Sequence, residues 1–376
     1  MHQAVQFQRL FELRPPNRDH IPALRTAVGV AVPLFVLLAI GRMDLAMCAN
    51  FGSFAGIYGR HEGRRIRVTN QIIVGAMLAT CVTLGASMSW WHASPLVVTL
   101  VTSVISCATA TVANLCGLRP AGSVFFVFCT AAIGSLPQGP NPVDALLAAL
   151  ASSLFCVALG LGWHLLGEGD VPGGPLKRAP RPPRPTVIAS AVRFFVAPLI
   201  AGLLGLLSVG FSPHLSHPYW AMIAAVVAFI GPRYLVQYQR VLQRVLGTLT
   251  GVLLAGFLLS HGMDAWQLII WVTIIQFLTE LTVTRNYVVG STFITPIALL
   301  MVHYFNPLPI GELMVTRSIE TIVGSAAALG VIMISFYWDH PKTVHRYMAK
   351  ARPCCQGVNA PLRPGGSCDA LDSEGC

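Results

Sequence analysis

The sequence predicts an all-α integral membrane protein of about 12 transmembrane helices, arranged as two parallel six-helix repeats with both termini cytoplasmic. Three observations carry this expectation: the composition, the distribution of arginine, and an internal repeat. Of the 376 residues, 54% are hydrophobic and only 11% are charged, which lies outside the range of water-soluble domains. Uncharged runs such as residues 94–116 are also long enough to cross a hydrocarbon core of about 30 Å as a helix.

Apolar windows between glycine, proline and charged residues predict the individual helices. Those at 44–59 and 217–232 are shorter than most. The twelve windows lie near residues 24–41, 44–59, 71–89, 95–114, 121–136, 143–166, 191–210, 217–232, 245–260, 265–283, 288–304 and 313–337.

The basic residues assign a side of the membrane to each loop, because cytoplasmic loops collect lysine and arginine. With a cytoplasmic N-terminus, all but two of the 25 basic residues fall in inner segments. The exceptions are Arg42, in an outer loop, and Arg317, within the last helix. This division requires an even number of spans in each half, so both termini are expected in the cytoplasm.

The repeat appears at an offset of 172 residues, where Gly59 and Gly75 match Gly231 and Gly247. Six spans in each half give a parallel repeat, and transporters commonly place their substrate path between such repeats. The predicted segments are a cytoplasmic N-terminal segment 1–23, a first membrane half 24–166, a Pro/Gly-rich cytoplasmic linker 167–190, a second membrane half 191–338 and a largely disordered cytoplasmic tail 339–376.

The basic segment after Gly231 carries Arg240 and Arg244 at a helical spacing. They mark either an inner loop that touches anionic headgroups or a basic collar at the inner mouth of a substrate path. Arg25 and Arg193, at matching positions of the two halves, are likewise either orientation signals or a pseudo-symmetric anion site. The pairs Gly52/Gly56 and Gly247/Gly251 are GxxxG motifs and predict close helix packing.

Ionisable residues within the spans are costly and therefore need an explanation. Arg317 and Glu320 lie three residues apart on one helix face, either as a structural ion pair or as an anion ligand with a protonatable partner. Glu280 is the second buried acid, and it is either neutralised by Arg285 five residues later or, like Glu320, a candidate for coupling to protons. His217, Tyr219 and Trp220 are either an interfacial aromatic anchor or a stacking site for an aromatic substrate.

The chain lacks two common sequence motifs, one for nucleotide binding and one for zinc-dependent catalysis. There is no phosphate-binding GxxxxGK[ST] loop and no HExxH zinc motif. His214 and His217 lack a suitably placed carboxylate for a catalytic zinc ion. The sequence therefore predicts no enzyme activity, no metal, no cofactor and no nucleic-acid partner.

Three segments carry a family resemblance. Residues 217–256, "HPYWAMIAAVVAFIGPRYLVQYQRVLQRVLGTLTGVLLAG", resemble the signature region of the fusaric acid resistance family, which is grouped with the aromatic acid exporters. "RNYVVGSTFITPIALL" and "RSIETIVGSAAAL" are similar to the last two spans of that family. The residues in these motifs are His217, Tyr219, Trp220, Arg240, Arg244, Gly247, Thr248, Arg285, Asn286, Tyr287, Arg317 and Glu320.

The resemblance implies a multi-pass protein of the cytoplasmic (inner or plasma) membrane that exports small, often aromatic, organic acids and is coupled to protons. Larger members carry a sizeable cytoplasmic region that this chain lacks, which leaves adaptor binding and substrate identity in doubt. Membrane lipid, an organic acid and protons are the expected partners, with a homo-oligomer or a membrane-fusion adaptor left open. A distant likeness to plant malate channels keeps a passive organic-anion channel open, and a non-transporting membrane scaffold is the third alternative.

Overall fold

Twelve α-helices and two short 3-10 helices form the described part of the computed structural model, which covers residues 18–60, 62–165, 183–211, 217–231 and 233–339. The chain divides into two units, Met1–Ile332 and Met333–Cys376, and the packing described below lies within the first. The elements are α2 (His20–Ala39), η1 (Met43–Leu45), α3 (Ala46–Ser53), η2 (Phe54–Ile57), α4 (Arg64–Trp90), α5 (Pro95–Cys116), α6 (Val124–Gly134), α7 (Pro142–Leu165), α8 (Arg184–Phe211), α9 (Tyr219–Ala228), α10 (Tyr234–Leu259), α11 (Ala265–Thr282), α12 (Tyr287–Phe305) and α13 (Ile310–Asp339).

Each predicted window contains one of these α-helices, but three of the helices are too short to cross a bilayer. In the described residues, nine helices have the length and apolarity of membrane spans. The helices α3, α6 and α9 have 8, 11 and 10 residues, which at 1.5 Å per residue is roughly half of a hydrocarbon core. The prediction of twelve spanning helices is therefore wrong at these three windows. Each window is apolar over its whole length, but part of it is irregular backbone buried within protein rather than helix.

Two predicted segment boundaries also differ from the structure. The helix α8 begins at Arg184, so the end of the segment predicted as linker, 167–190, is helical. The helix α2 begins at His20, inside the predicted N-terminal segment 1–23. Residues 1–17, 166–182 and 340–376 lie outside the described residues, and with them most of the predicted linker and tail.

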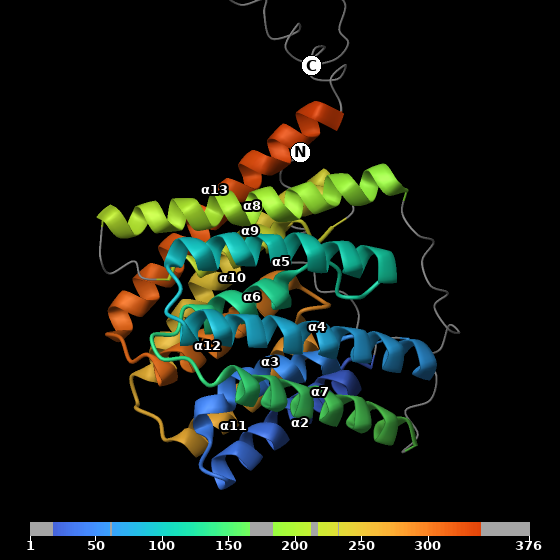
Figure 1. The fold of residues 1–376 in the computed structure, drawn as a ribbon, viewed down its shortest axis with the longest axis vertical. Helices are drawn as coiled ribbons and strands as arrows, with labels where there is room; N and C mark the ends of the chain where they lie inside the picture. The colour runs from blue at the N-terminus through green and yellow to red at the C-terminus, as the bar shows by residue number, and fades with distance from the viewer. Residues whose placement is uncertain (1–17, 61, 166–182, 212–216, 232, 340–376) are drawn as a thin grey trace, which may run out of the picture. The chain divides into compact units, whose positions relative to one another are not determined.

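The short helices are enclosed by the long ones. Every residue of α3 and of α9 is buried, as expected for helices that are apolar on all sides. The helix α3 packs on α7 and α2, while α9 packs on α8 and α10. Long helices pair across the two halves of the chain: α2 lies against α11, and α8 lies along α5 (Figure 1).

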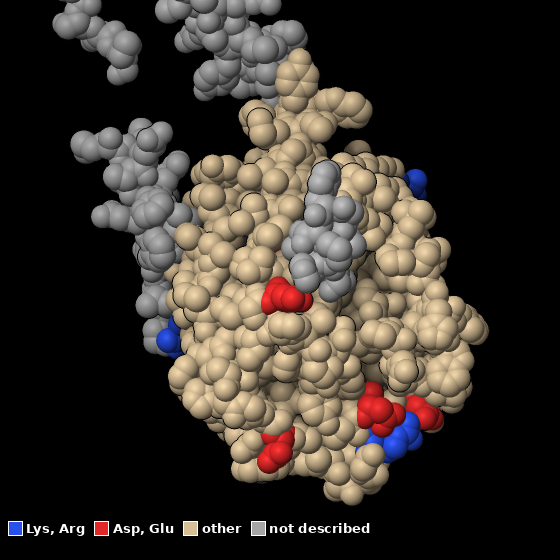
Figure 2. Space-filling model, turned by 90° about the vertical axis from the view of Figure 1, so that its left-hand side faces the viewer, with Lys and Arg blue, Asp and Glu red and all other residues tan. Residues whose placement is uncertain are grey.

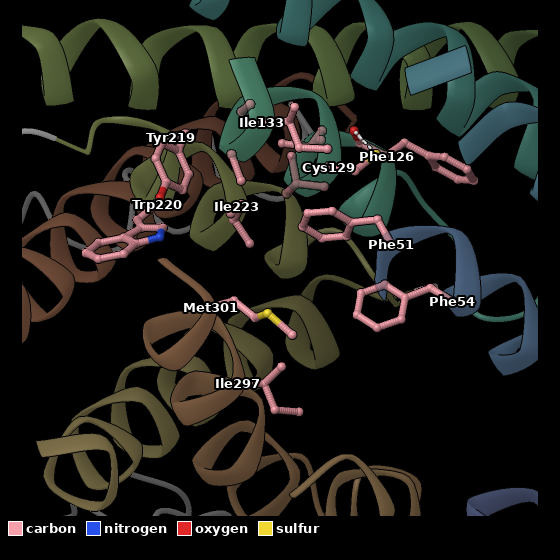
Figure 3. Close-up of a cluster of buried hydrophobic side chains, with 14 of the residues drawn as sticks. Phe51, Phe54, Phe126, Cys129, Ile133, Tyr219, Trp220, Ile223, Ile297 and Met301 are labelled. Atoms are coloured by element: carbon pink, nitrogen blue, oxygen red, sulfur yellow. Dashed lines mark hydrogen bonds between the residues drawn. The ribbon is translucent and has the colours of Figure 1, made fainter. Parts of the chain in front are cut away.

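The centre of this unit is an apolar seam, formed by Phe51, Phe54, Phe128, Ile297 and Met301. Figure 3 shows Ile297 and Met301 of α12 facing Phe51 and Phe54. Phe51 meets Phe128 of α6 edge to face, with 4.9 Å between the ring centroids. The cavity left among these side chains is about 20 Å³, little more than one water molecule requires. The seam is therefore closed in this conformation.

The outer faces of the long helices are apolar as well. Along α10, the exposed side chains Leu242, Leu246, Leu249, Leu253 and Phe257 recur at helical spacing. The opposite face of α10 is buried. An exposed apolar stripe of this length is unfavourable in water and suits contact with lipid.

Glycines bring several helices into backbone contact. A Cβ on Gly324 of α13 would collide with the carbonyl of Ala221 on α9, and its distance to the carbonyl carbon would be 2.7 Å. A Cβ on Gly52 would lie 2.8 Å from the Cα of Ala149, and one on Gly56 would lie 3.4 Å from Cys156. Cβ atoms on Gly247 and Gly251 would stand 2.6 Å and 2.7 Å from side-chain atoms of α12. These crossings leave no room for larger residues.

An ion network joins the two halves through Arg60, Asp19, Glu280 and Arg285, and is called the Arg60 network below. Arg60 donates to Glu280 Oε2 at 3.0 Å and lies 3.7 Å from Asp19 Oδ1, while Arg285 donates to Asp19 Oδ2 at 3.1 Å. Gln276 donates to the other oxygen of Glu280 at 3.3 Å. The expectation that Arg285 neutralises Glu280 is therefore wrong, because the network pairs residues that are distant in the sequence.

Replacing Gly324 by alanine should destabilise the protein. The added methyl group meets backbone atoms of α9, which cannot yield as a side chain can, and overpacking of this kind costs about 1–3 kcal/mol. Gly330→Ala on the same helix is the matched control, because nothing lies within 4 Å of its Cβ position. The check is the midpoint of thermal unfolding in detergent; equal midpoints for the two variants would contradict the crossing described.

Removing Arg60 should also destabilise the protein, because Arg60→Ala leaves the buried Glu280 without its ion-pair partner, while Asp19 keeps Arg285. Breaking a buried pair on one side costs about 3–5 kcal/mol. Arg42→Ala is the control: its ion pair with Asp44 is half exposed, and such pairs contribute about 0–1 kcal/mol. Thermal unfolding of R60A, E280Q and the double variant measures the coupling. Additive losses would argue against a direct pair.

Candidate functional site

Two arginines that are buried at mid-depth in the helices define the candidate site. Arg244 is 2% exposed and Arg317 is 1% exposed. Arg244 lies about 15 Å along α10, and Arg317 about 10 Å along α13, at 1.5 Å per residue. A buried cation in a span has a large cost unless the protein or a ligand compensates it. The surroundings of both guanidinium groups are therefore informative.

Arg317 is held by aromatic side chains from the start of α9. Its guanidinium carbon lies 5.0 Å from the ring centroid of Trp220, within the range of a cation–π contact. His217 stacks on the Trp220 ring with 4.8 Å between centroids and 15° between planes, and Tyr219 meets Trp220 edge to face. All three are buried, whereas an interfacial anchor would need contact with lipid. The structure thus places the predicted aromatic residues around Arg317.

Glu320 lies one turn after Arg317 and has a different partner. Its Oε1 accepts a hydrogen bond from Ser208 of α8 at 3.1 Å. Its Oε2 is buried and accepts no side-chain hydrogen bond, while the backbone of Ala221 lies close enough to the carboxyl group to hydrogen-bond with it. Both residues are described, and no ion pair joins Glu320 to Arg317 within 4.0 Å, although the two charges interact electrostatically. The alternative of a simple structural ion pair is therefore not what the geometry shows.

Ser208, Trp220, Arg244, Arg317 and Glu320 are called the polar cluster below. Arg244 donates to Ser291 of α12 at 3.3 Å, and its charge acts on Arg317. Five buried polar atoms of the polar cluster have no hydrogen-bond partner in the described structure: Nε of Arg244, Nε and Nη1 of Arg317, Nε1 of Trp220 and Oε2 of Glu320.

Unsatisfied buried polar atoms are rare in native proteins, and each needs an explanation. Four of these five atoms are N–H donors, three of them on cationic groups. Donors with no acceptor within the protein are suited to an acceptor from outside it. The polar cluster can therefore receive an anion without first breaking an ion pair.

The other predicted arginines lie outside the polar cluster. The guanidinium of Arg240 lies 4.4 Å from the Tyr287 ring centroid, and Arg193 donates to the Tyr234 hydroxyl at 2.7 Å. Arg25 is buried in α2 and acts electrostatically on Glu280. Arg25 and Arg193 are thus in different surroundings. Glu280 and Arg285 belong to the Arg60 network, which is separate from the polar cluster.

A pocket of about 410 Å³ lies at the end of this unit where α4 passes into α5. It is called the end pocket, and its walls come from the α4–α5 connection, the end of α6, α8 and the start of α9. Pro218, Tyr219 and Met222 of the α9 segment line it together with Leu206 of α8. Tyr219 therefore borders both the end pocket and the polar cluster. Among the described residues, no group of three or more His, Cys, Asp or Glu side chains could hold a metal ion.

Sequence reasoning did not identify Ser208, Ser291, Arg60 or Asp19. A serine in a membrane span is common, and its partner Glu320 is more than a hundred residues away. Arg60 resembled the other basic residues of an inner loop. Only the packing of helices shows which of these ordinary residues meet a buried charge.

Comparison with known proteins gives matches to parts of this chain. Its matched segments are 27% identical to the uncharacterised membrane protein YvaC of Bacillus subtilis (strain 168) over 144 residues, and 28% identical to the uncharacterised protein slr1298 of Synechocystis sp. over 133 residues. These segments are 38% and 35% of this chain, but only 22% and 17% of the relatives. No solved structure matches the chain. Residues 196–331, which contain the whole polar cluster, match the family model described as fusaric acid resistance protein-like, which confirms the resemblance over that range.

Proposed function

We propose that this protein is a secondary active exporter of small organic acids, chiefly aromatic carboxylic acids, and that the polar cluster is its anion site. The observation that carries the proposal is the set of buried N–H donors on Arg244, Arg317 and Trp220 without an acceptor. The comparisons support the coarser statement, a membrane protein with a fusaric acid resistance protein-like segment. The substrate class and the proton coupling go beyond these comparisons and are part of our proposal.

The donors suit a planar carboxylate. A guanidinium group binds a carboxylate through two parallel N–H···O bonds. In Arg317, Nε and Nη1 make no hydrogen bond within the protein, and each can donate to an anion. The Trp220 ring is already in contact with Arg317 and stacked on by His217, whereas Tyr219, which also lines the end pocket, offers an aromatic surface beside them for a substrate ring. An aromatic acid would compensate the buried charge and bury its own apolar part in the same step.

Glu320 gives the anion site a dependence on protons. With Glu320 ionised, its charge partly compensates that of Arg317. With Glu320 protonated, the net positive charge of the polar cluster rises, and an anion is bound more strongly. Anion affinity and proton affinity are then linked, each by the same factor. A site that binds a proton and the anion together favours their joint movement, so this linkage supports proton-dependent transport. The outward direction that we propose rests on the likeness to fusaric acid resistance proteins.

The arrangement of the halves fits a parallel repeat. In the predicted register, α2 and α8 are the first helices of their halves, and α5 and α11 are the fourth. If a two-fold rotation exchanges the halves, the first helix of each half must contact the fourth helix of the other half. The contacts of α2 with α11 and of α8 with α5 meet this requirement. They support, together with the matching glycines, the duplication proposed from the sequence and a substrate path between the repeats.

Charge distribution supports a cytoplasmic membrane location with both termini inside. Figure 2 shows a face with few lysine or arginine side chains and several acidic ones. Arg42, an exception in the predicted orientation, is paired with Asp44 at 3.0 Å and Asp144 at 2.7 Å. These hydrogen bonds raise the pKa of Arg42 above its ordinary value. Arg317, the other exception, belongs to the polar cluster, so each exception has a structural reason.

The two alternatives are less well supported. A passive channel needs a continuous polar path, whereas the apolar seam leaves about 20 Å³ between its side chains. A scaffold has no use for buried donors without acceptors, since apolar residues of similar volume would be more stable there. Alternating access, in which the seam opens on one side at a time, agrees with both observations.

Replacing Arg317 by glutamine should reduce transport of aromatic acids by at least about tenfold, which corresponds to the loss of one charge-assisted hydrogen bond. Arg317→Lys should retain part of the activity, because the charge remains while the planar donor pair is lost. Uptake of labelled benzoate and related acids into inside-out vesicles, at equal protein levels, is the measurement. Arg42→Gln is the control. Full activity of R317Q would exclude this residue as the anion ligand.

Replacing Glu320 by glutamine should make transport independent of the pH difference across the membrane. The side chain keeps its shape and can still accept a hydrogen bond from Ser208, but it no longer exchanges a proton. In the unsubstituted protein, imposing a pH difference should change the accumulation of the acid; in E320Q the same difference should have no effect. Glu280→Gln is the companion variant. If E320Q responded to pH like the parent, Glu320 would not be the coupling group.

A further inference from the structure

We propose that the end pocket is a water-accessible vestibule through which Glu320 exchanges its proton with the compartment at that end of the protein. The inference deepens the proposed function, since it rests on Glu320 being the proton-exchanging group. Glu320 itself is 0% exposed, so a proton must reach it through a wall of the protein. The question is which wall is thinnest.

The protein between Glu320 and the end pocket is thinnest at Gly205 of α8. A Cβ on Gly205 would stand 2.9 Å from Glu320 Oε2 and also 2.9 Å from Cβ of Pro218. The unbonded oxygen of Glu320 and the ring of Pro218 therefore approach the same point in space. Pro218 and Leu206, the residue after Gly205, both line the end pocket. The free oxygen is thus separated from the pocket by one layer of atoms, and glycine at position 205 keeps that layer thin.

The end pocket is suited to water. Its volume of about 410 Å³ is far above the ~10–15 Å³ that a single water requires. Ser89, His92, Ser135 and Tyr219 contribute polar atoms to its lining. Ser135 and His92 are exposed, so the pocket communicates with the surface. Water can therefore reach Pro218 and the thin wall.

Other sides of Glu320 are closed by charge or by packing. On its own helix lies Arg317, which opposes the approach of a hydronium ion; on α8 lies Ser208, which occupies Oε1. From the α9 segment the backbone of Ala221 and the ring of Pro218 face the carboxylate. The pocket side is the one that leads from Oε2 to water.

The test follows the protonation of Glu320 itself and needs no transport. Dicyclohexylcarbodiimide modifies carboxyl groups that are protonated and in apolar surroundings. Mass spectrometry locates the modified residue, and the variants E320Q and E280Q, each of which lacks one of the two buried carboxyl groups, confirm the assignment. Sealed vesicles are labelled without substrate while the pH is varied on one side at a time. A Ser135→Cys thiol in the end pocket, reacted with a membrane-impermeant reagent, reports which compartment the pocket faces.

We expect the labelling rate of Glu320 to fall by about tenfold when the pH of the compartment facing Ser135→Cys is raised by two units, and to ignore the other compartment. Filling the pocket by coupling a bulky impermeant reagent to S135C should abolish this response, while the parent treated alike keeps it. The labelling rate of Glu280 should change neither with the pH of that compartment nor with filling of the end pocket.

Two results would overturn the vestibule. One is a labelling rate that follows the pH of the compartment opposite to Ser135→Cys; the other is a response that persists with the pocket filled. Because labelling does not depend on substrate, a protein that fails to move organic acids but shows the expected pH response would disprove the proposed function and leave this inference standing. The reverse combination would disprove the vestibule alone.

Discussion

A charge inside a bilayer must be compensated by the protein or by something that the protein binds, because no bulk water is available to do so. The described helices meet this constraint in two ways. In the Arg60 network, cations and carboxylates from distant segments neutralise one another. In the polar cluster, Arg244 and Arg317 keep donors that nothing in the protein satisfies. The first arrangement joins helices through ion pairs, and the second leaves the donors on which the proposed anion site rests.

The short helices explain how a polar cluster can exist at this depth. A helix that spans the membrane places its ends at the two surfaces, whereas α9 begins inside the unit, at a Pro-Tyr-Trp segment. Its start can therefore deliver Trp220 and the backbone of Ala221 to Arg317 and Glu320. Irregular backbone at membrane depth is tolerated only where protein surrounds it, and the shell of long helices provides that cover. The close contact at Gly324 then fixes α13 against α9.

The sequence was sufficient for what depends on local composition. Apolar length and arginine distribution located twelve helices and singled out Arg317, Glu320, His217, Tyr219 and Trp220. They could not identify which helices are short, because buried loops in a membrane protein are as apolar as spans. They also could not pair Arg60 with Glu280 or Ser208 with Glu320, because such partners meet only through tertiary packing. For Glu280 the nearest arginine in the sequence was the natural expectation, and it was the wrong one.

The two halves of the chain differ in the charges that their sixth helices carry. The helix α7, sixth in the first half, carries a single charged residue, Asp144, and this is paired with Arg42 at the surface. The helix α13, sixth in the second half, carries Arg317 and Glu320 in its buried interior. The first half supplies Arg60 and Asp19, which tie it to α11. The proposed anion site therefore lies within the segment that matches the fusaric acid resistance protein-like family, while the first half contributes one side of the end pocket.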